Sequence, residues 1–168
     1  MRIFDRLAAA HGMDTDVWER HANPWSGWTR FPILPLLTLA IYARIWIGWW
    51  CLLPVAVLIA WTWINPRAFP PPSSTRSWMS RAVMGERVWL NHAQKPIPQH
   101  HIGAVRVLNS VGLLGLPLLV WGLWVLNPWA TAFGVAVLIG MKMWFLDRMV
   151  WIFDDMARTD AAYRAWLR

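Results

Sequence analysis

The sequence is poor in charged residues: Asp, Glu, Lys and Arg make up only 15% of its 168 residues. A soluble domain usually carries about 25%. Hydrophobic residues instead reach 57%, and 16 residues are Trp. This composition excludes an ordinary soluble domain and predicts an all-α integral membrane protein that has lipid as part of its solvent.

Cysteine and acidic residues are also scarce. Cys51 is the one cysteine, so an intramolecular disulfide is excluded. The sequence has nine acidic residues and 16 basic ones, which gives a net charge of +7. Such an excess is typical of nucleic-acid-binding proteins. Here the basic residues flank long apolar runs, so we expect membrane lipids and not nucleic acid as the partner.

Four apolar segments approach the length of about 20 residues that a helix needs to cross a bilayer. They are Phe31 to Ile47, Trp49 to Ile64, Val105 to Leu126 and Trp129 to Leu146. Because very few residues separate the members of each pair, we predict two transmembrane hairpins.

The turn residues agree with these hairpins. Gly48 alone separates the first pair of segments, and Asn127-Pro128 separates the second pair. Asn is a favoured N-cap and Pro a favoured first helical residue, so the fourth helix is predicted to begin here. Two further Asn-Pro pairs, at Asn23 and Asn65, are predicted to mark helix boundaries.

The basic residues predict the orientation. All Lys and Arg except Arg44 lie in the N-terminal arm, in the central loop with the first residues of the third segment, or at the C-terminal end from Lys142 onward. The positive-inside rule places these parts in the cytoplasm. We therefore predict a bacterial inner-membrane protein with both termini cytoplasmic. Arg44, near the outer end of the first segment, is expected to snorkel or to bind an anion.

The chain thus divides into five parts. Residues 1–30 form a cytoplasmic arm with short interfacial helices, the first carrying Ile3, Phe4 and Leu7 on one face. Residues 31–66 form the first transmembrane hairpin and 67–104 a cytoplasmic loop with a Pro-rich connector. Residues 105–146 form the second hairpin, and 147–168 extend its last helix into the cytoplasm.

The cytoplasmic loop contains an amphipathic helix, predicted from Ser77 to His92 to lie on the membrane surface. Its apolar stripe includes Trp78, Gly85 and Trp89. Glu86 falls within the apolar arc, where a carboxylate needs a cationic or hydrogen-bonding partner. A structural ion pair is the expected explanation, and a catalytic acid is the alternative.

The ends of the third and fourth helices supply further polar residues. Small residues of the fourth helix share a face with Asp147 and Asp154, which predicts that this face packs against other helices. Asp155 is turned further away, and Lys142 is expected to snorkel on the other side. Arg106 and Asn109 of the third helix are expected to meet Asp147. The polar cluster is therefore Glu86, Arg106, Asn109, Asp147, Asp154 and Asp155.

Histidines offer a possible metal site, because imidazole and carboxylate ligands suit Fe, Mn or Zn. The candidates are His21, His92, His100 and His101. Their spacing follows no His-Glu-x-x-His pattern. Adjacent His100 and His101 are not expected to face one site in a regular helix.

Three motifs resemble those of an uncharacterised family of small bacterial membrane proteins. They are Trp18-Glu19-Arg20-His21-Ala22-Asn23-Pro24-Trp25-Ser26, Trp63-Ile64-Asn65-Pro66-Arg67 with Phe69-Pro70, and Gly85-Glu86-Arg87-Val88-Trp89. The resemblance extends over nearly the whole chain. It implies a four-helix integral membrane protein but no activity or ligand.

A second similarity concerns the first motif. His21-Ala22-Asn23-Pro24 ahead of a helical hairpin is similar to the opening of the yeast-type membrane 2-hydroxy fatty acid dioxygenases. Those proteins use iron held by histidines. Where they carry further histidines, this chain has Arg30 and Trp61 or Trp63.

Three functions fit these observations. The first is a non-catalytic scaffold or accessory subunit that contacts lipid, pigment or partner helices. The second is a membrane-embedded enzyme, metal-dependent or not, that acts on a lipid-like substrate at the cytoplasmic face. The third is a small ion binder or transporter that works as an oligomer.

Overall fold

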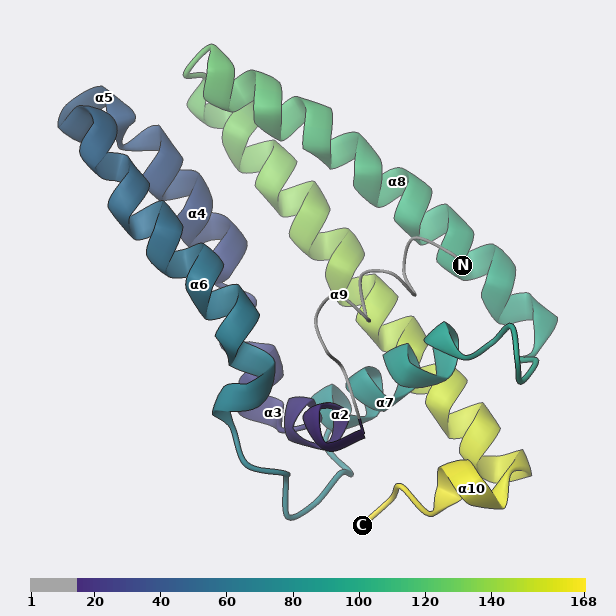
Figure 1. Ribbon diagram of the computed structural model, residues 1–168. Helices are drawn as coiled ribbons and strands as arrows, with labels where there is room; N and C mark the ends of the chain where they lie inside the picture. The colour runs from purple at the N-terminus through teal and green to yellow at the C-terminus, as the bar shows by residue number, and fades with distance from the viewer. Residues whose placement is uncertain (1–14) are drawn as a thin grey trace.

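The computed structural model describes residues 15–168, which form helices and turns with no strand (Figure 1). This confirms the all-α class. The predicted helix through Ile3, Phe4 and Leu7 lies outside the described residues. The helices are α2 (Thr15–His21), α3 (Pro24–Trp28), α4 (Ile33–Tyr42), α5 (Arg44–Ile47), the 3-10 helix η1 (Gly48–Cys51), α6 (Leu52–Ala68), α7 (Trp78–Leu90), α8 (Gln99–Trp124), α9 (Pro128–Thr159) and α10 (Ala161–Arg164).

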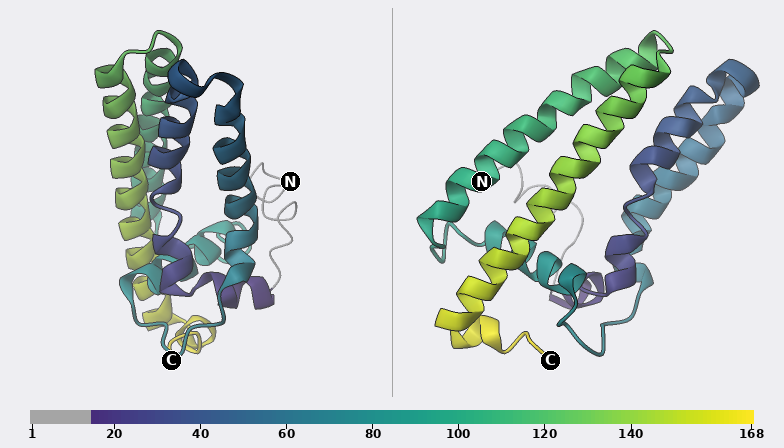
Figure 2. Two further views of the ribbon diagram at one scale, coloured as in Figure 1. Left: turned by 90° about the vertical axis from the view of Figure 1, so that its left-hand side faces the viewer. Right: turned by 180° about the vertical axis from the view of Figure 1, so that it is seen from behind.

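Three helical segments are long and apolar enough to cross a membrane: Pro24–Ala68, Gln99–Trp124 and Pro128–Thr159. The first contains a reversal of the chain at Gly48, whose φ of +54° is in the region that favours glycine. As a result α4 and α6 run side by side (Figure 1). The α4–α6 and α8–α9 pairs rise from the same end of the molecule (Figure 2).

Helices α8 and α9 approach each other closely at glycines. A Cβ atom on Gly122 would lie 2.5 Å from the backbone nitrogen of Thr131, and one on Gly134 would lie 2.7 Å from that of Leu119. The prediction of which face of α9 packs against other helices is wrong for the N-terminal half of this helix. Its small residues Ala132, Ala136 and Gly140 are exposed, because Thr131 and Gly134 occupy the contact with α8.

Asparagine side chains cap two helices, and of these the cap at Asn127 was predicted. The Asn127 carboxamide oxygen accepts a hydrogen bond from the backbone N–H of Ala130 (3.0 Å), and Pro128 begins α9. Asn23 accepts in the same way from Trp25 at the start of α3. Asn65-Pro66 is different: it lies inside α6, not at its boundary. The Asn65 side chain is buried and makes hydrogen bonds to Ser26 of α3 and to Thr29 directly after it.

The core lies where α7 crosses the C-terminal half of α9. A Cβ atom on Gly85 would lie 1.9 Å from the carbonyl oxygen of Met149, so the two backbones touch. Val88 of α7 and Phe153 of α9 are fully buried in the same cluster. Helix α7 therefore packs within the protein on most of its sides and is not a helix that simply rests on a membrane surface.

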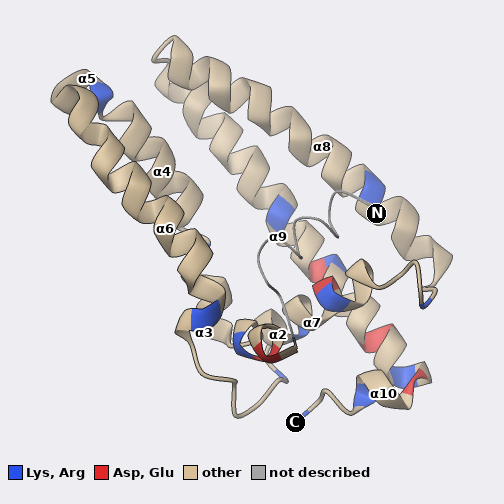
Figure 3. Cartoon of the chain, in the orientation of Figure 1, with Lys and Arg blue, Asp and Glu red and all other residues tan. Residues whose placement is uncertain are grey.

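Charged residues collect at one end of the molecule, with α2, α3, α7 and α10 (Figure 3). We call this the charged end, and the opposite one, with the turns at Gly48 and Asn127, the turn end. Arg44 lies at the turn end, where its guanidinium donates to the carbonyl of Leu123, and the Tyr42 hydroxyl donates to that of Leu126 (2.8 Å). Arg44 thus binds the C-terminal carbonyls of α8, and the expectation of a free snorkelling side chain is corrected.

Candidate functional site

A cavity of about 700 Å³ lies above α7, between α6 on one side and α8 and α9 on the other. This volume is in the range of about 300–1,000 Å³ found for small-molecule sites. Its walls are mainly apolar: Trp18, Pro66, Trp89, Leu90, Leu108, Leu113, Leu138, Met141 and Phe145. Four polar groups at the charged end interrupt this lining, namely His21, Arg30, Glu86 and Lys142. The cavity therefore has an apolar body and a charged floor.

Glu86 and Lys142 form an ion pair on this floor, with Lys142 Nζ 2.7 Å from Glu86 Oε1. Lys142 was expected to snorkel away from the packing face, but it turns toward α7 because the Glu86 carboxylate lies there. The two side chains differ in exposure, at 19% for Glu86 and 53% for Lys142. Lys142 therefore keeps a solvent-facing or ligand-facing surface while it neutralises Glu86.

The His21 ring has a defined tautomer. Arg30 Nη2 lies 2.5 Å from His21 Nε2, and a guanidinium can only donate, so Nε2 must accept and carries no proton. The proton is then on Nδ1, which donates to Ser26 Oγ at 2.9 Å. His21 is thus neutral, and the Arg30 guanidinium is the cation on this side of the cavity.

The network continues from Ser26 into α6. Ser26 Oγ donates to Asn65 Oδ1 (2.8 Å), and Asn65 Nδ2 donates to Thr29 Oγ1 (2.8 Å). The Thr29 hydroxyl donates to the carbonyl of Trp25 at 2.6 Å. A weaker contact of the same hydroxyl, at 3.5 Å, is to the carbonyl of Ser26. The network fixes α2, α3 and the end of α6 around Arg30.

The electrostatics of the floor follow from burial and from neighbouring charges. Burial, together with the positive charge of Arg30, lowers the pKa of His21 to about 3, so its ring stays neutral at neutral pH. Burial opposes ionisation of Glu86, but Lys142 and Arg30 outweigh it and hold the pKa of this carboxyl below its usual range. The floor thus holds two cations and one anion, which leaves one excess positive charge.

The predicted polar cluster is divided between several places. Glu86 and Asn109 line the cavity. Arg106 is exposed and makes no ion pair with Asp147 in the part of the chain that the structure describes, so that expected pairing is wrong. Asp147 instead accepts a hydrogen bond from Trp78 Nε1 (3.0 Å), because α7 and not the start of α8 covers this face of α9.

Asp154 and three of the four candidate histidines, His92, His100 and His101, do not line the cavity, whereas His21 does. Asp154 pairs with Arg81 of α7 at 2.8 Å. His92 stacks on Trp89 with ring centroids 4.5 Å apart. His100 and His101 both approach Asp155, so the expectation that adjacent histidines cannot face one site is wrong here. At the first turn of α8 the two side chains converge, with ring centroids 4.1 Å apart.

The surroundings of His21 do not fit an iron site. Both ring nitrogens have a partner, since Nε2 accepts from Arg30 and Nδ1 donates to Ser26. A metal ion bound to Nε2 would have to displace the guanidinium and would lie beside its positive charge. The similarity to histidine-ligated fatty acid dioxygenases therefore does not extend to this site.

The model of a protein family described as a family of unknown function (DUF6653) matches residues 2–166. The chain belongs to this family. No curated protein and no solved structure matches the chain. Membership in DUF6653 agrees with the resemblance to an uncharacterised family and assigns no activity.

Arg30 of the cavity floor, and Ser26 and Asn65 of the network beside it, carried no recognised signal in the sequence. Arg30 is one basic residue among many in the flanking segments, and Ser26 and Asn65 are separated by a whole helical hairpin. The Asn-Pro motif at Asn65 was the available clue, because a buried Asn side chain must find hydrogen-bond partners. Its partners became apparent only once α3 and α6 were placed together.

Proposed function

We propose that the protein crosses the bacterial inner membrane four times, as the helices α4–α5, α6, α8 and α9, with both termini in the cytoplasm. The turn end would face the outer side and the charged end the cytoplasm. Support comes from the Trp side chains of both turns, which are highly exposed: Trp46, Trp49, Trp50, Trp124 and Trp129. Trp favours the headgroup level of a bilayer. The concentration of Lys and Arg at the other end supports the orientation.

Reporter insertions test this topology. A reporter between Ser73 and Ser74 and one after Arg168 are expected to give a cytoplasmic signal. A reporter at Gly48 is expected to give the opposite signal, because this residue lies in the turn between α4–α5 and α6. A cytoplasmic signal at Gly48 would contradict the four crossings.

We further propose that the protein is a binding protein for an amphiphile with an anionic head group. The apolar wall of the cavity would accept the hydrocarbon chain, and Arg30 and Lys142 would bind the head group. The single observation that carries this proposal is the excess positive charge on the floor of an otherwise apolar cavity. Charge-assisted hydrogen bonds to such a head group are among the stronger polar interactions.

This binding role suits a scaffold or accessory subunit better than an enzyme. A metal-dependent enzyme acting on the bound lipid needs metal ligands at the cavity. The group His100, His101 and Asp155 could hold a metal ion, but none of these residues lines the cavity. Glu86 is engaged by Lys142 and is ionised, so it is not poised to act as a general acid.

Binding measurements with delipidated protein in mild detergent test the proposal. The probes are a long-chain fatty acid, phosphatidylglycerol and, as an uncharged control, a monoacylglycerol. We expect the two anionic probes to bind more tightly than the control. The fatty acid and phosphatidylglycerol arms distinguish a carboxylate from a phosphate head group.

Two substitutions on the same ion pair provide matched controls. Lys142→Gln removes a cation from the floor and is expected to weaken binding of the anionic probes by about tenfold, equivalent to about 1.4 kcal/mol. Glu86→Gln removes the competing anion and is expected to strengthen their binding. Equal affinities of both variants and the wild type, or tighter binding of the uncharged control, would refute an anion-binding floor.

A further inference from the structure

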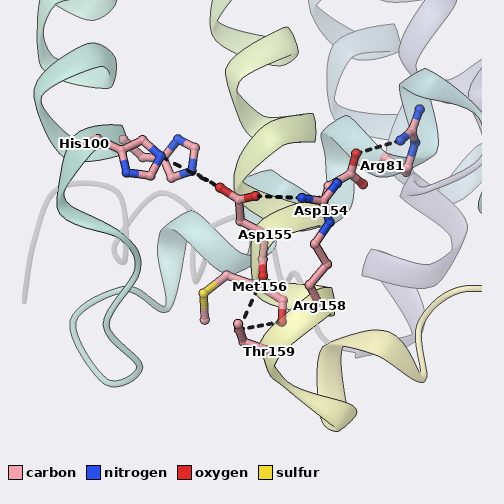
Figure 4. Close-up of polar contacts among 8 residues, drawn as sticks. Arg81, His100, Asp154, Asp155, Met156, Arg158 and Thr159 are labelled. Atoms are coloured by element: carbon pink, nitrogen blue, oxygen red, sulfur yellow. Dashed lines mark hydrogen bonds and ion pairs between the residues drawn. The ribbon is translucent and has the colours of Figure 1, made fainter.

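A second group of ligating side chains lies outside the cavity, where the start of α8 meets the C-terminal half of α9 (Figure 4). His101 Nε2 lies 3.0 Å from Asp155 Oδ2, and His100 Nε2 lies 3.8 Å from the same oxygen. One ligand atom from each of the three residues falls within 4.8 Å of the others. Asp155 is 54 positions after His101 in the sequence, so the fold brings it to the two histidines.

We propose that His100, His101 and Asp155 bind a divalent transition-metal ion, with Zn²⁺ as the best-suited ion. Zn²⁺ binds imidazole nitrogen and carboxylate oxygen at about 2.0–2.2 Å in tetrahedral geometry, which places neighbouring ligand atoms about 3.3 Å apart. The two distances to Asp155 Oδ2 lie on either side of this value. Two imidazoles and one carboxylate favour Zn²⁺ over Mg²⁺ or Ca²⁺, which prefer oxygen ligands.

The His101 ring is held in the orientation that a ligand needs. Its side chain is fully buried, and its Nδ1 atom has no hydrogen-bond partner within the described residues. Nε2 is thus the one ring nitrogen with a polar neighbour, and it points toward Asp155. A ligand fixed in this way loses little conformational entropy when the ion binds.

The remaining neighbours leave the side chains of His100 and Asp155 partly exposed to an incoming ion. Arg158 lies 3.8 Å from Asp155, but at the other carboxylate oxygen, Oδ1, and its side chain is 79% exposed. It can therefore turn toward solvent when a cation arrives. Asp154, one residue earlier, points to the opposite side and pairs with Arg81 (Figure 4). His100 is 65% exposed, which gives the ion a path from solution.

The ion would join the first turn of α8 to α9 at the charged end. The close contacts of Gly122 and Gly134 hold these helices together at the turn end, so the metal would fasten the other end of the same pair. Three protein ligands leave a fourth position for water. The site is independent of the proposed amphiphile binding, because it shares no residue with the cavity.

Calorimetric titration of the full-length, tag-free protein with Zn²⁺ in mild detergent, after treatment with a chelator, tests the proposal. We expect one Zn²⁺ per chain. His100→Ala and Asp155→Asn should each weaken binding by more than the roughly 10–100-fold that loss of an outer-shell partner costs. Both positions are solvent-accessible, so these variants should fold. His92→Ala, which removes a histidine that lies against Trp89, and Asp154→Asn serve as matched controls and should bind as the wild type does.

A stability measurement supplies a second readout. Saturating Zn²⁺ is expected to raise the melting temperature of the wild type and of His92→Ala, and to leave those of His100→Ala and Asp155→Asn unchanged. Substitution with Co²⁺ should give the visible absorption of a tetrahedral site in the wild type. Absence of Zn²⁺ binding by the wild type, or equal binding by all four variants, would overturn the proposal. Loss of amphiphile binding in Lys142→Gln would have no bearing on it.

Discussion

Replacement of Gly85 by Ala is the most informative perturbation of the core, because it acts where α7 and α9 touch. The new Cβ atom would lie 1.9 Å from the carbonyl oxygen of Met149, whereas ordinary van der Waals contact begins at 3.4 Å. The two helices must therefore separate locally by the difference, about 1.5 Å. Because the obstructing atoms belong to the backbone of a long helix, no side-chain rotation relieves the clash.

The expected cost follows from opposing terms. Overpacking of a core typically costs about 1–3 kcal/mol. Replacement of Gly by Ala in a helix returns up to about 1 kcal/mol through helix propensity. Because backbone atoms of Met149 obstruct the new Cβ atom, we take the upper part of the overpacking range, about 2–3 kcal/mol, and expect a net loss of about 1–2 kcal/mol. For a chain of this size each kcal/mol corresponds to about 2–4 °C in melting temperature, so the melting temperature should fall by about 2–8 °C.

Gly140→Ala is the matched control. It changes the same residue type in α9, but a Cβ atom there meets nothing within 4 Å. Its melting temperature should equal or exceed that of the wild type, measured by thermal denaturation of the purified protein in one detergent. A Gly85→Ala protein as stable as Gly140→Ala would refute the close approach of α7 and α9.

Three further predictions concern polar contacts. Arg44→Ala removes the donor to the end of α8 and should lower the melting temperature, whereas Arg44→Lys should retain part of the stability. Asp147→Ala leaves Trp78 Nε1 without an acceptor and should cost about 1–3 kcal/mol in unfolding free energy. Arg106→Ala should be nearly neutral. Equal losses in the two variants would instead support a contact between Arg106 and Asp147. The neutral state of His21 stabilises the fold fully above pH 6.5, and this contribution is lost as the pH falls toward about 3, at up to about 1.4 kcal/mol per pH unit. His21→Gln should therefore reduce the fall in melting temperature between pH 7 and pH 5, and an unchanged pH dependence would contradict this reading.

The local signals in the sequence predicted much of the fold. Gly48 and Asn127-Pro128 correctly marked the two chain reversals, since a positive φ and an N-cap are local requirements. The periodicity after Ser77 likewise located α7 to within two residues of its observed end. Such features depend on a few neighbouring residues, so they can be identified without knowledge of the tertiary contacts.

The contact partners of individual side chains were harder to predict from the sequence. Helical periodicity placed Lys142 on the opposite side from Asp147, but it could not indicate that α7 would present Glu86 to Lys142. Similarly, the rule that adjacent residues in a helix diverge failed for His100 and His101, because the first turn of α8 lies against α9 and both rings reach Asp155. These contacts are set by the crossing of α7, α8 and α9, which no single segment encodes.

Photo-crosslinking with a fatty acid that carries a diazirine in its hydrocarbon chain tests the proposed binding function most directly. The purified protein in detergent micelles would receive the probe at a low molar ratio, and the adducts would be mapped by mass spectrometry. We expect adducts concentrated in residues 108–113 and 138–145, the segments of α8 and α9 that contain cavity-lining residues, and we expect Lys142→Gln to diminish them. Adducts spread evenly over the exposed Trp side chains of the turn end, and insensitive to Lys142→Gln, would contradict the binding of an anionic amphiphile in this cavity.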